Sequence, residues 1–285
     1  MQKLIMAVLL IFFLGFIETA NAEPLWQTLP PTPVLPKADH SGYANINGTR
    51  IWYAEFGHGK PVILLHGAFT NSNYWGNQIP VLAKHYKVIV MDSRGQGRSE
   101  NNEKFLSYDL MSSDVIGLMD FLNIKQAAII GWSDGAIIGL DIAIHHPERL
   151  TKLFAFGANS DPNGVRPDVM KSSVIQACLA RTKIEYEKLS PTPSQYQALS
   201  DQLNKMMDTQ PNFTKAQLNS ITVPTWIVDG DHDEGIKREN TEYMAAEIPG
   251  AGLLILPSVS HFAFLQNPQQ FNDNVLNFLV AKPEY

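Results

Sequence analysis

Short apolar runs alternate with longer stretches of mixed polarity through most of this chain. Mostly apolar runs are typical of strands buried on both faces of a sheet, and apolar residues spaced three and four apart predict helices. Strands that alternate with helices indicate an α/β fold with a mostly parallel central sheet flanked by helices. The predicted buried strands are 61–65, 87–91, 127–131, 153–156, 225–228 and 253–256, and the predicted helices are 75–85, 109–122, 135–145, 238–248 and 269–280.

Ahead of these runs, residues 43–46 and 50–55 alternate in polarity on either side of Asn47-Gly48. This dipeptide favours a tight hairpin turn, because both of its residues tolerate a positive φ. We therefore expect an antiparallel pair of strands to open the sheet.

No convincing buried strand is predicted between 157 and 224, although 169–189 and 196–207 show helical spacing. We therefore predict a helical cap at about 163–220, inserted into a single domain that spans 41–285.

The first 22 residues have the features of a secretory signal peptide. Lys3 precedes an apolar run at 4–17, and Ala20-Asn21-Ala22 supplies the small residues expected before a cleavage site. A membrane anchor is the alternative, but the run is shorter than the roughly 20 residues that a spanning helix needs. We expect export to the periplasm or the medium, no stable membrane span after cleavage, and a proline-rich arm at 23–40 leading into the domain.

Composition narrows the class of protein. The chain has 285 residues, of which 45% are hydrophobic, so it can bury a large core. Its net charge of -6 arises from 28 acidic and 22 basic residues with no block of like charge, which excludes the clustered basic surface that nucleic acid requires. Cys178 is the single cysteine and is expected in the core rather than as a nucleophile. The oligomeric state is not indicated.

The strongest chemical signal follows the predicted strand 127–131. There Gly131-Trp132-Ser133-Asp134-Gly135 runs directly into a predicted helix, which is a G-x-S-x-G nucleophile elbow in its strand-turn-helix context. Glycines on both sides are needed because a Cβ would collide in so tight a turn. Ser133 is therefore the predicted nucleophile.

A serine hydroxyl needs a base to accept its proton during attack. His261 follows the last predicted strand and so belongs at the carboxyl edge of the sheet, where active sites of parallel sheets lie. Structural roles are expected for His40, His58, His85, His145 and His146.

Taken together, the strand, elbow, insertion, late acidic segment and later histidine resemble the α/β-hydrolase superfamily, over nearly all of the mature chain. The elbow is similar to that of biphenyl hydrolase-like proteins, which accept α-amino acid esters. The resemblance implies an α/β-hydrolase fold and serine chemistry without a cofactor.

The resemblance also implies the residue that orients His261. The family pattern G-x-x-D maps onto Gly230 and Asp233, so Asp233 is the expected acid, with Asp231 and Glu234 as alternatives. This acidic run lacks the spacing of a calcium loop, and no metal site is predicted.

Two backbone amides should stabilise the oxyanion of the intermediate. One is that of Asp134, and the other comes from the 66–69 loop, which resembles the family's His-Gly loop; Ala68 is favoured, with Phe69 as the alternative. His66 is expected to brace this loop. The 92–99 segment matches the family's D-x-R-G-x-G-x-S loop and is expected to be structural, because it lacks the spacing of a dinucleotide site.

Substrate preference is less constrained by the sequence. The Asp134 side chain could pair with a cationic amine or simply cap its helix, and Trp132, Phe69 and Phe262 could line an acyl pocket or belong to the core. We predict an exported serine hydrolase that cleaves a small carboxylic ester. A lactonase, an aminopeptidase-like enzyme, a carbon-carbon bond hydrolase, an acyltransferase and a noncatalytic binding protein are the alternatives.

Overall fold

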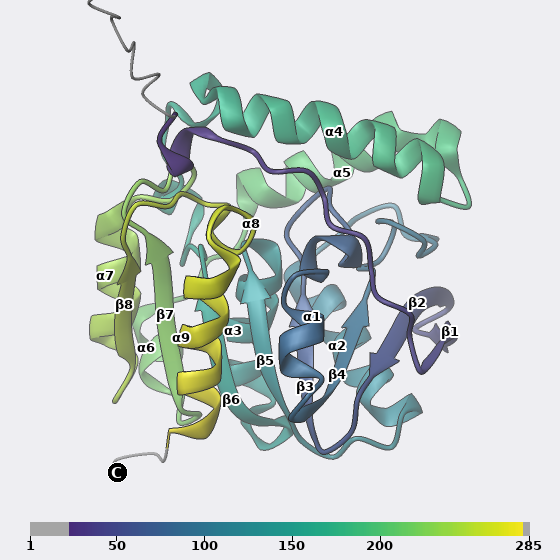
Figure 1. Cartoon of the computed structure of the whole chain (residues 1–285), viewed down its shortest axis with the longest axis horizontal. Coiled ribbons are helices and arrows are strands. Elements are labelled where there is room, and N and C mark those ends of the chain that lie inside the picture. The colour runs from purple at the N-terminus through teal and green to yellow at the C-terminus, as the bar shows by residue number, and fades with distance from the viewer. Residues whose placement is uncertain (1–22, 282–285) are drawn as a thin grey trace, which may run out of the picture.

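A single eight-stranded sheet forms the centre of the protein in the computed structural model, which describes residues 23–281 (Figure 1). The strand order is β1-β2-β4-β3-β5-β6-β7-β8; β2 runs antiparallel to β1 and β4, and the other pairs are parallel. The predicted α/β-hydrolase fold is confirmed. The strands are β1 (His40–Ile46), β2 (Thr49–Phe56), β3 (Lys60–Leu65), β4 (Tyr86–Met91), β5 (Ala127–Trp132), β6 (Leu150–Phe156), β7 (Thr225–Gly230) and β8 (Gly252–Leu256).

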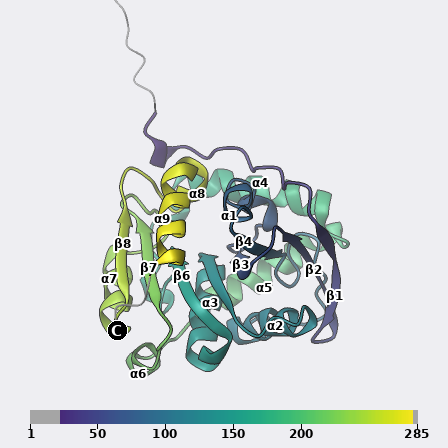
Figure 2. The same ribbon diagram turned by 60° about the horizontal axis from the view of Figure 1, so that its bottom comes forward.

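Helices cover both faces of the sheet, as Figure 2 shows. Alternate strand residues point to opposite sides: Ile63 packs in the core with α2, α3 and α7, whereas Leu64 packs in the core with α1 and α9. The α-helices of residues 23–281 are α1 (Ile79–Leu82), α2 (Tyr108–Phe121), α3 (Asp134–His145), α4 (Ser173–Leu189), α5 (Tyr196–Thr209), α6 (Lys215–Asn219), α7 (Arg238–Glu247), α8 (Ala263–Gln266) and α9 (Pro268–Val280).

The opening hairpin forms as predicted. Asn47 and Gly48 adopt φ angles of 45° and 74°, which allow the two-residue turn between β1 and β2.

The helix predicted at 75–85 is wrong in length. A short 3₁₀ turn, Ser72–Trp75, is followed by α1, which spans four residues. Pro80 lies in the first turn of α1, the part of a helix where proline is tolerated, so one continuous helix cannot pass through it.

Two segments cross above the carboxyl ends of the parallel strands. Helices α4 and α5, from the insertion between β6 and β7, lie across the top in Figure 1, and the arm at 24–39 runs beside them. Helix α6 departs from this arrangement, because it packs against α7 through the Lys215–Glu247 ion pair. The covering part of the insertion is therefore α4 and α5.

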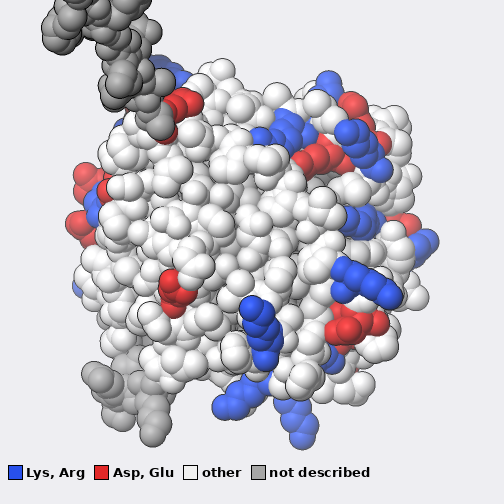
Figure 3. Space-filling model, in the orientation of Figure 1, with Lys and Arg blue, Asp and Glu red and all other residues white. Residues whose placement is uncertain are grey.

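Charged side chains of both signs are interspersed on the face shown in Figure 3, with a broad uncharged area beside them. This face carries no broad basic surface of the kind that polyanions need. Within residues 23–281, none of the helices combines the length and apolarity required to span a bilayer. The predicted signal peptide, 1–22, lies outside the described residues.

Candidate active site

The elbow at the end of β5 holds Ser133 in a strained conformation. Its φ and ψ are 54° and -120°, its amide donates to the carbonyl of Phe156 at 2.8 Å, and α3 begins at the next residue. A Cβ on Gly131 would lie 2.4 Å from the carbonyl oxygen of Gly135, and one on Gly135 would lie 2.2 Å from that of Leu65. The turn is therefore closed to any residue but glycine at both positions.

Asp233 and His261 are paired in the loops after β7 and β8. The Asp233 Oδ2 atom lies 2.7 Å from Nδ1 of His261, while Asp233 Oδ1 accepts hydrogen bonds from the amides of Gly235 and Ile236, both at 2.7 Å. The other carboxylates of the loop bind elsewhere: Asp231 accepts from the amide of Val259, and Glu234 accepts from the backbone amide of His261.

The electrostatics of this pair favour a charged imidazole. Burial lowers the pKa of His261, but the Asp233 carboxylate and then Glu234 and Asp134 outweigh it, so the pKa is raised. Burial also acts against ionised Asp233, whose pKa is nevertheless held below its usual value by His261 and by the amides. An ionised Asp233 fixes the proton of neutral His261 on Nδ1 and leaves Nε2 as the basic nitrogen.

The elbow and the pair share one edge of the sheet. Strands β3, β5, β6, β7 and β8 are parallel, so the loops that follow them emerge together. A Cβ on Gly67, after β3, would lie 3.1 Å from Cβ of Ser133, and one on Gly157, after β6, would lie 2.7 Å from Cε1 of His261. The indole of Trp132 lies 5.8 Å from the His261 ring, centroid to centroid. Sequence-distant groups are thus gathered around the elbow.

Three backbone amides near Ser133 are available for an oxyanion. Within residues 23–281, those of Ala68, Phe69 and Asp134 donate no hydrogen bond. Asp134 opens α3, where the helix dipole favours negative charge, and Ala68 and Phe69 follow Gly67 in the loop after β3, which approaches Ser133.

His66 braces the loop that carries Ala68. Its Nε2 accepts from the amide of Ser93 at 2.9 Å, so the proton is on Nδ1, which donates to the carbonyl of Gly67 at 2.8 Å. Burial lowers the pKa of His66, which keeps the ring neutral. His66 is structural, as predicted.

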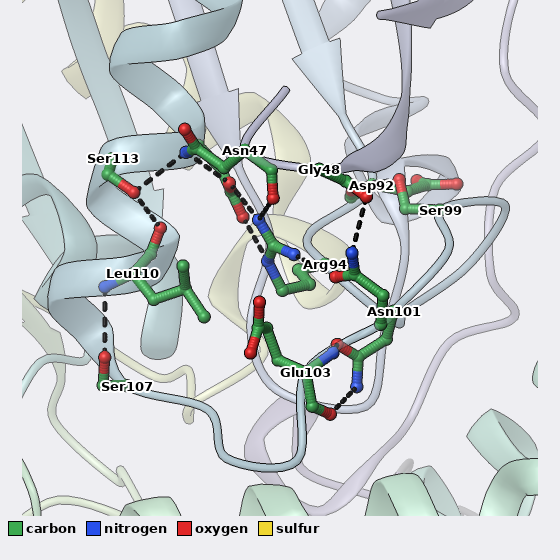
Figure 4. Close-up of polar contacts among 12 residues, drawn as sticks. Asn47, Gly48, Asp92, Arg94, Ser99, Asn101, Glu103, Ser107, Leu110 and Ser113 are labelled. Carbon is green, nitrogen blue, oxygen red and sulfur yellow. Dashed lines mark hydrogen bonds and ion pairs between the residues drawn. The ribbon is translucent and has the colours of Figure 1, made fainter. Parts of the chain in front are cut away.

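The 92–99 loop is held by a buried polar network. Figure 4 shows the Arg94 guanidinium beside Asn47 and α2. Arg94 is 0% exposed and binds Asp114 through two hydrogen bonds of 2.8 and 2.6 Å. Asp92 accepts from the amides of Ser72 and Arg98, both at 2.8 Å. These internal bonds hold Asp92 and Arg94 and give the loop the structural role that its sequence indicates.

The Asp134 side chain does not cap α3. Its Oδ1 accepts a hydrogen bond of 2.8 Å from the hydroxyl of Tyr108, and Oδ2 is buried with no hydrogen-bond partner among the described residues. Burial raises the pKa of Asp134 to about 6. Sequence reasoning missed Tyr108, because it lies 26 positions away and carries no local signal.

The aromatic residues proposed for a pocket differ in burial. Trp132 and Phe262 are 2% and 1% exposed and pack with Tyr74 and Phe264. Both residues therefore belong to the core, which was the alternative to a role in an acyl pocket. Phe69 is half-buried and lies in the loop after β3, next to the elbow. Of the three, Phe69 is therefore the side chain with exposed surface at this edge.

Two further features concern metals and thiols. Among residues 23–281, no cluster of three or more histidine, cysteine or acidic side chains has a metal-binding arrangement.

Cys178 is buried on α4, and burial raises the pKa of its thiol to about 12, which agrees with the predicted core position.

Fold and elbow define the class: the chain belongs to the α/β-hydrolase superfamily, and it is a hydrolase of that family. The family profile described as alpha/beta hydrolase fold matches residues 60–174. The chain is 26% identical to serine hydrolase BPHL of Mus musculus over 87% of its own length and 89% of that protein, and 25% identical to the pimeloyl-[acyl-carrier protein] methyl ester esterase of Aeromonas hydrophila over 79% and 97%. A solved structure of Est816, described as an N-acyl homoserine lactone degrading enzyme, superposes with a TM-score of 0.72 at 26% identity, covering 83% of this chain and all of that one.

Proposed function

We propose that the protein is a serine hydrolase that cleaves a small carboxylic ester through an acyl-serine intermediate. The observation that carries the proposal is the 2.7 Å contact between Asp233 and His261 at the sheet edge that also bears the strained elbow. The methyl ester esterase among the relatives supports this substrate class, and the lactones named for Est816 make a lactonase the alternative.

Each proposed step has a group to perform it. The Ser133 Oγ attacks the carbonyl carbon while His261 Nε2 takes its proton, and the amides of Ala68 and Asp134 stabilise the oxyanion. The ester C–O bond then breaks, and the leaving alkoxide takes the proton from His261. A water molecule attacks the acyl-serine with His261 again as base, which releases the acid and restores Ser133.

The test compares the wild type with Ser133→Ala on nitrophenyl esters, lactones and aminoacyl substrates, together with labelling by a fluorophosphonate probe. Ester hydrolysis and labelling should both disappear in the variant, a loss of about 10⁶-fold in kcat for residues of this kind. Equal ester hydrolysis by the two proteins would overturn the proposal, as would a preference for lactones that leaves esters almost untouched.

A preference for α-amino esters is a second candidate, which the unpartnered Oδ2 of Asp134 favours. A substrate ammonium group could complete the hydrogen bonding of this buried oxygen. Asp134→Asn should then reduce kcat/KM for amino esters more than for matched neutral esters. An unchanged ratio between the two substrates would rule out this role.

Export is proposed from residues 1–22. Expression of the full chain should yield a protein whose N-terminus is Glu23, found outside the cytoplasm, and Ala22→Arg should block the processing. Intact mass spectrometry decides, since an uncleaved wild-type chain contradicts the proposal.

A further inference from the structure

We propose that Glu234, acting with Ser260 and Gln266, is a positioning residue that holds the backbone of His261 and adds negative charge beside its ring. This inference rests on the proposed function, in which His261 is the base. Glu234 follows Asp233 directly in the chain, but its carboxylate binds the backbone amide of His261, whereas Asp233 binds the ring.

Side chains fix two consecutive amides of the histidine loop. The Glu234 Oε2 atom accepts from the amide of His261 at 3.1 Å, and the Gln266 Oε1 atom accepts from the amide of Ser260 at 2.7 Å. A loop amide held by a side chain loses much of its conformational freedom, so the two bonds restrict the backbone from which the imidazole projects.

The Ser260 hydroxyl joins these two side chains. It donates to Oε1 of Glu234 at 3.3 Å and accepts from Nε2 of Gln266 at 2.9 Å. The same Nε2 donates to the carbonyl of Thr28 in the N-terminal arm, also at 2.9 Å. A continuous set of hydrogen bonds therefore connects the acid loop, the histidine loop and the arm.

Charge adds a second effect. The acidic groups that face His261 are Asp233 and Glu234 from the loop after β7 and Asp134 from α3, and each raises the pKa of the imidazole against the effect of burial. Glu234 is mostly buried, and burial followed by the nearby Asp233 raises its own pKa. When it is ionised, the Glu234 carboxylate favours the imidazolium that forms as Ser133 gives up its proton.

The test uses two variants of the mature protein and one matched control. Glu234→Gln removes the charge but retains an oxygen acceptor, Glu234→Ala removes both, and Glu239→Gln makes the same chemical change at an exposed position on α7. Profiles of kcat and kcat/KM against pH are measured for a nitrophenyl ester.

Glu234→Ala should lower kcat by about tenfold to a hundredfold with little change in KM, because a base displaced by a fraction of an ångström loses its alignment. Glu234→Gln should move the acidic limb of the kcat/KM profile to lower pH, since the charge that raises the pKa of His261 is gone. Glu239→Gln should match the wild type. If Glu234→Ala fails to fold, the glutamine variant decides the question.

The proposal is overturned if both Glu234 variants behave like Glu239→Gln. Ser133→Ala, assayed in parallel, separates the two levels of inference. An inactive Ser133→Ala with unaffected Glu234 variants rejects only the positioning role, whereas an active Ser133→Ala rejects the proposed function itself.

Discussion

Asp233 Oδ2 and His261 Nδ1 lie 2.7 Å apart although 28 positions separate the two residues in the chain. The last residues of β7 and β8, Gly230 and Leu256, are paired in the sheet. Asp233 lies three positions beyond the first, and His261 lies five beyond the second. The register between β7 and the edge strand β8 therefore sets a contact on which the proposed chemistry depends.

Replacing the acid should impair turnover without unfolding the protein. In Asp233→Asn the amide can present its NH₂ to Nδ1, which places the imidazole proton on the wrong nitrogen, and kcat should fall by about 10⁴-fold. Asp231→Asn is the matched control, because the Asp231 carboxylate contacts the amide of Val259 and the ring of His232 rather than His261. A large loss in Asp231→Asn together with an active Asp233→Asn would contradict the assignment.

The pH profile of kcat/KM should reflect the raised pKa of His261. The base acts only as neutral imidazole, so a raised pKa means that activity falls, as the pH is lowered, around a value above the usual 6.5 for histidine. Steady-state kinetics between pH 5 and pH 9 measure this limb. A midpoint below the usual value would be inconsistent with an ionised Asp233 beside the ring.

Asp229 should make stability depend on pH. It is 1% exposed, and burial, followed by the charge of Asp233, raises its pKa well above the usual value. Folded protein then retains a proton that the unfolded chain releases, so stability is lost as pH rises from the unfolded pKa towards the folded one, by about 1.4 kcal/mol per pH unit.

Asp229→Asn removes this dependence and should increase the free energy of unfolding at neutral pH more than at pH 4. Urea titrations of both proteins at the two pH values measure the difference. An equal effect of the substitution at both pH values would show that Asp229 does not titrate in this way.

The buried Arg94–Asp114 pair should contribute strongly to stability. Asp114→Asn leaves a guanidinium that is 0% exposed without its anionic partner, and the free energy of unfolding should fall by about 3 to 5 kcal/mol. Asp120→Asn, which breaks the surface pair with Arg149, should change it by less than about 1 kcal/mol. Comparable effects of the two substitutions would refute the role of burial.

Local features of the sequence account for much of the fold. The apolar runs correspond to strands, Asn47-Gly48 forms the hairpin, and the glycines of the elbow are required by contacts as short as 2.2 Å. These features are predictable because side-chain periodicity and the steric demands of tight turns act within a few residues. The burial predicted for 253–256 is wrong, because β8 is an edge strand in which only Leu256 is buried and Leu253 is 49% exposed. The predicted helix 75–85 is broken at Pro80, which can lie only in the first turn of α1.

The site depended more on tertiary structure. The sequence by itself determined that a nucleophile elbow, an acidic run and a late histidine follow parallel strands. It did not determine which carboxylate contacts the imidazole, because Asp231, Asp233 and Glu234 all lie in the same short acidic run. Their different contacts depend on how the loops after β7 and β8 lie against each other. Likewise, only packing between α2 and α3 could bring Tyr108 to Asp134. Contacts between distant segments arise from how whole elements pack, and no short stretch of sequence records that geometry.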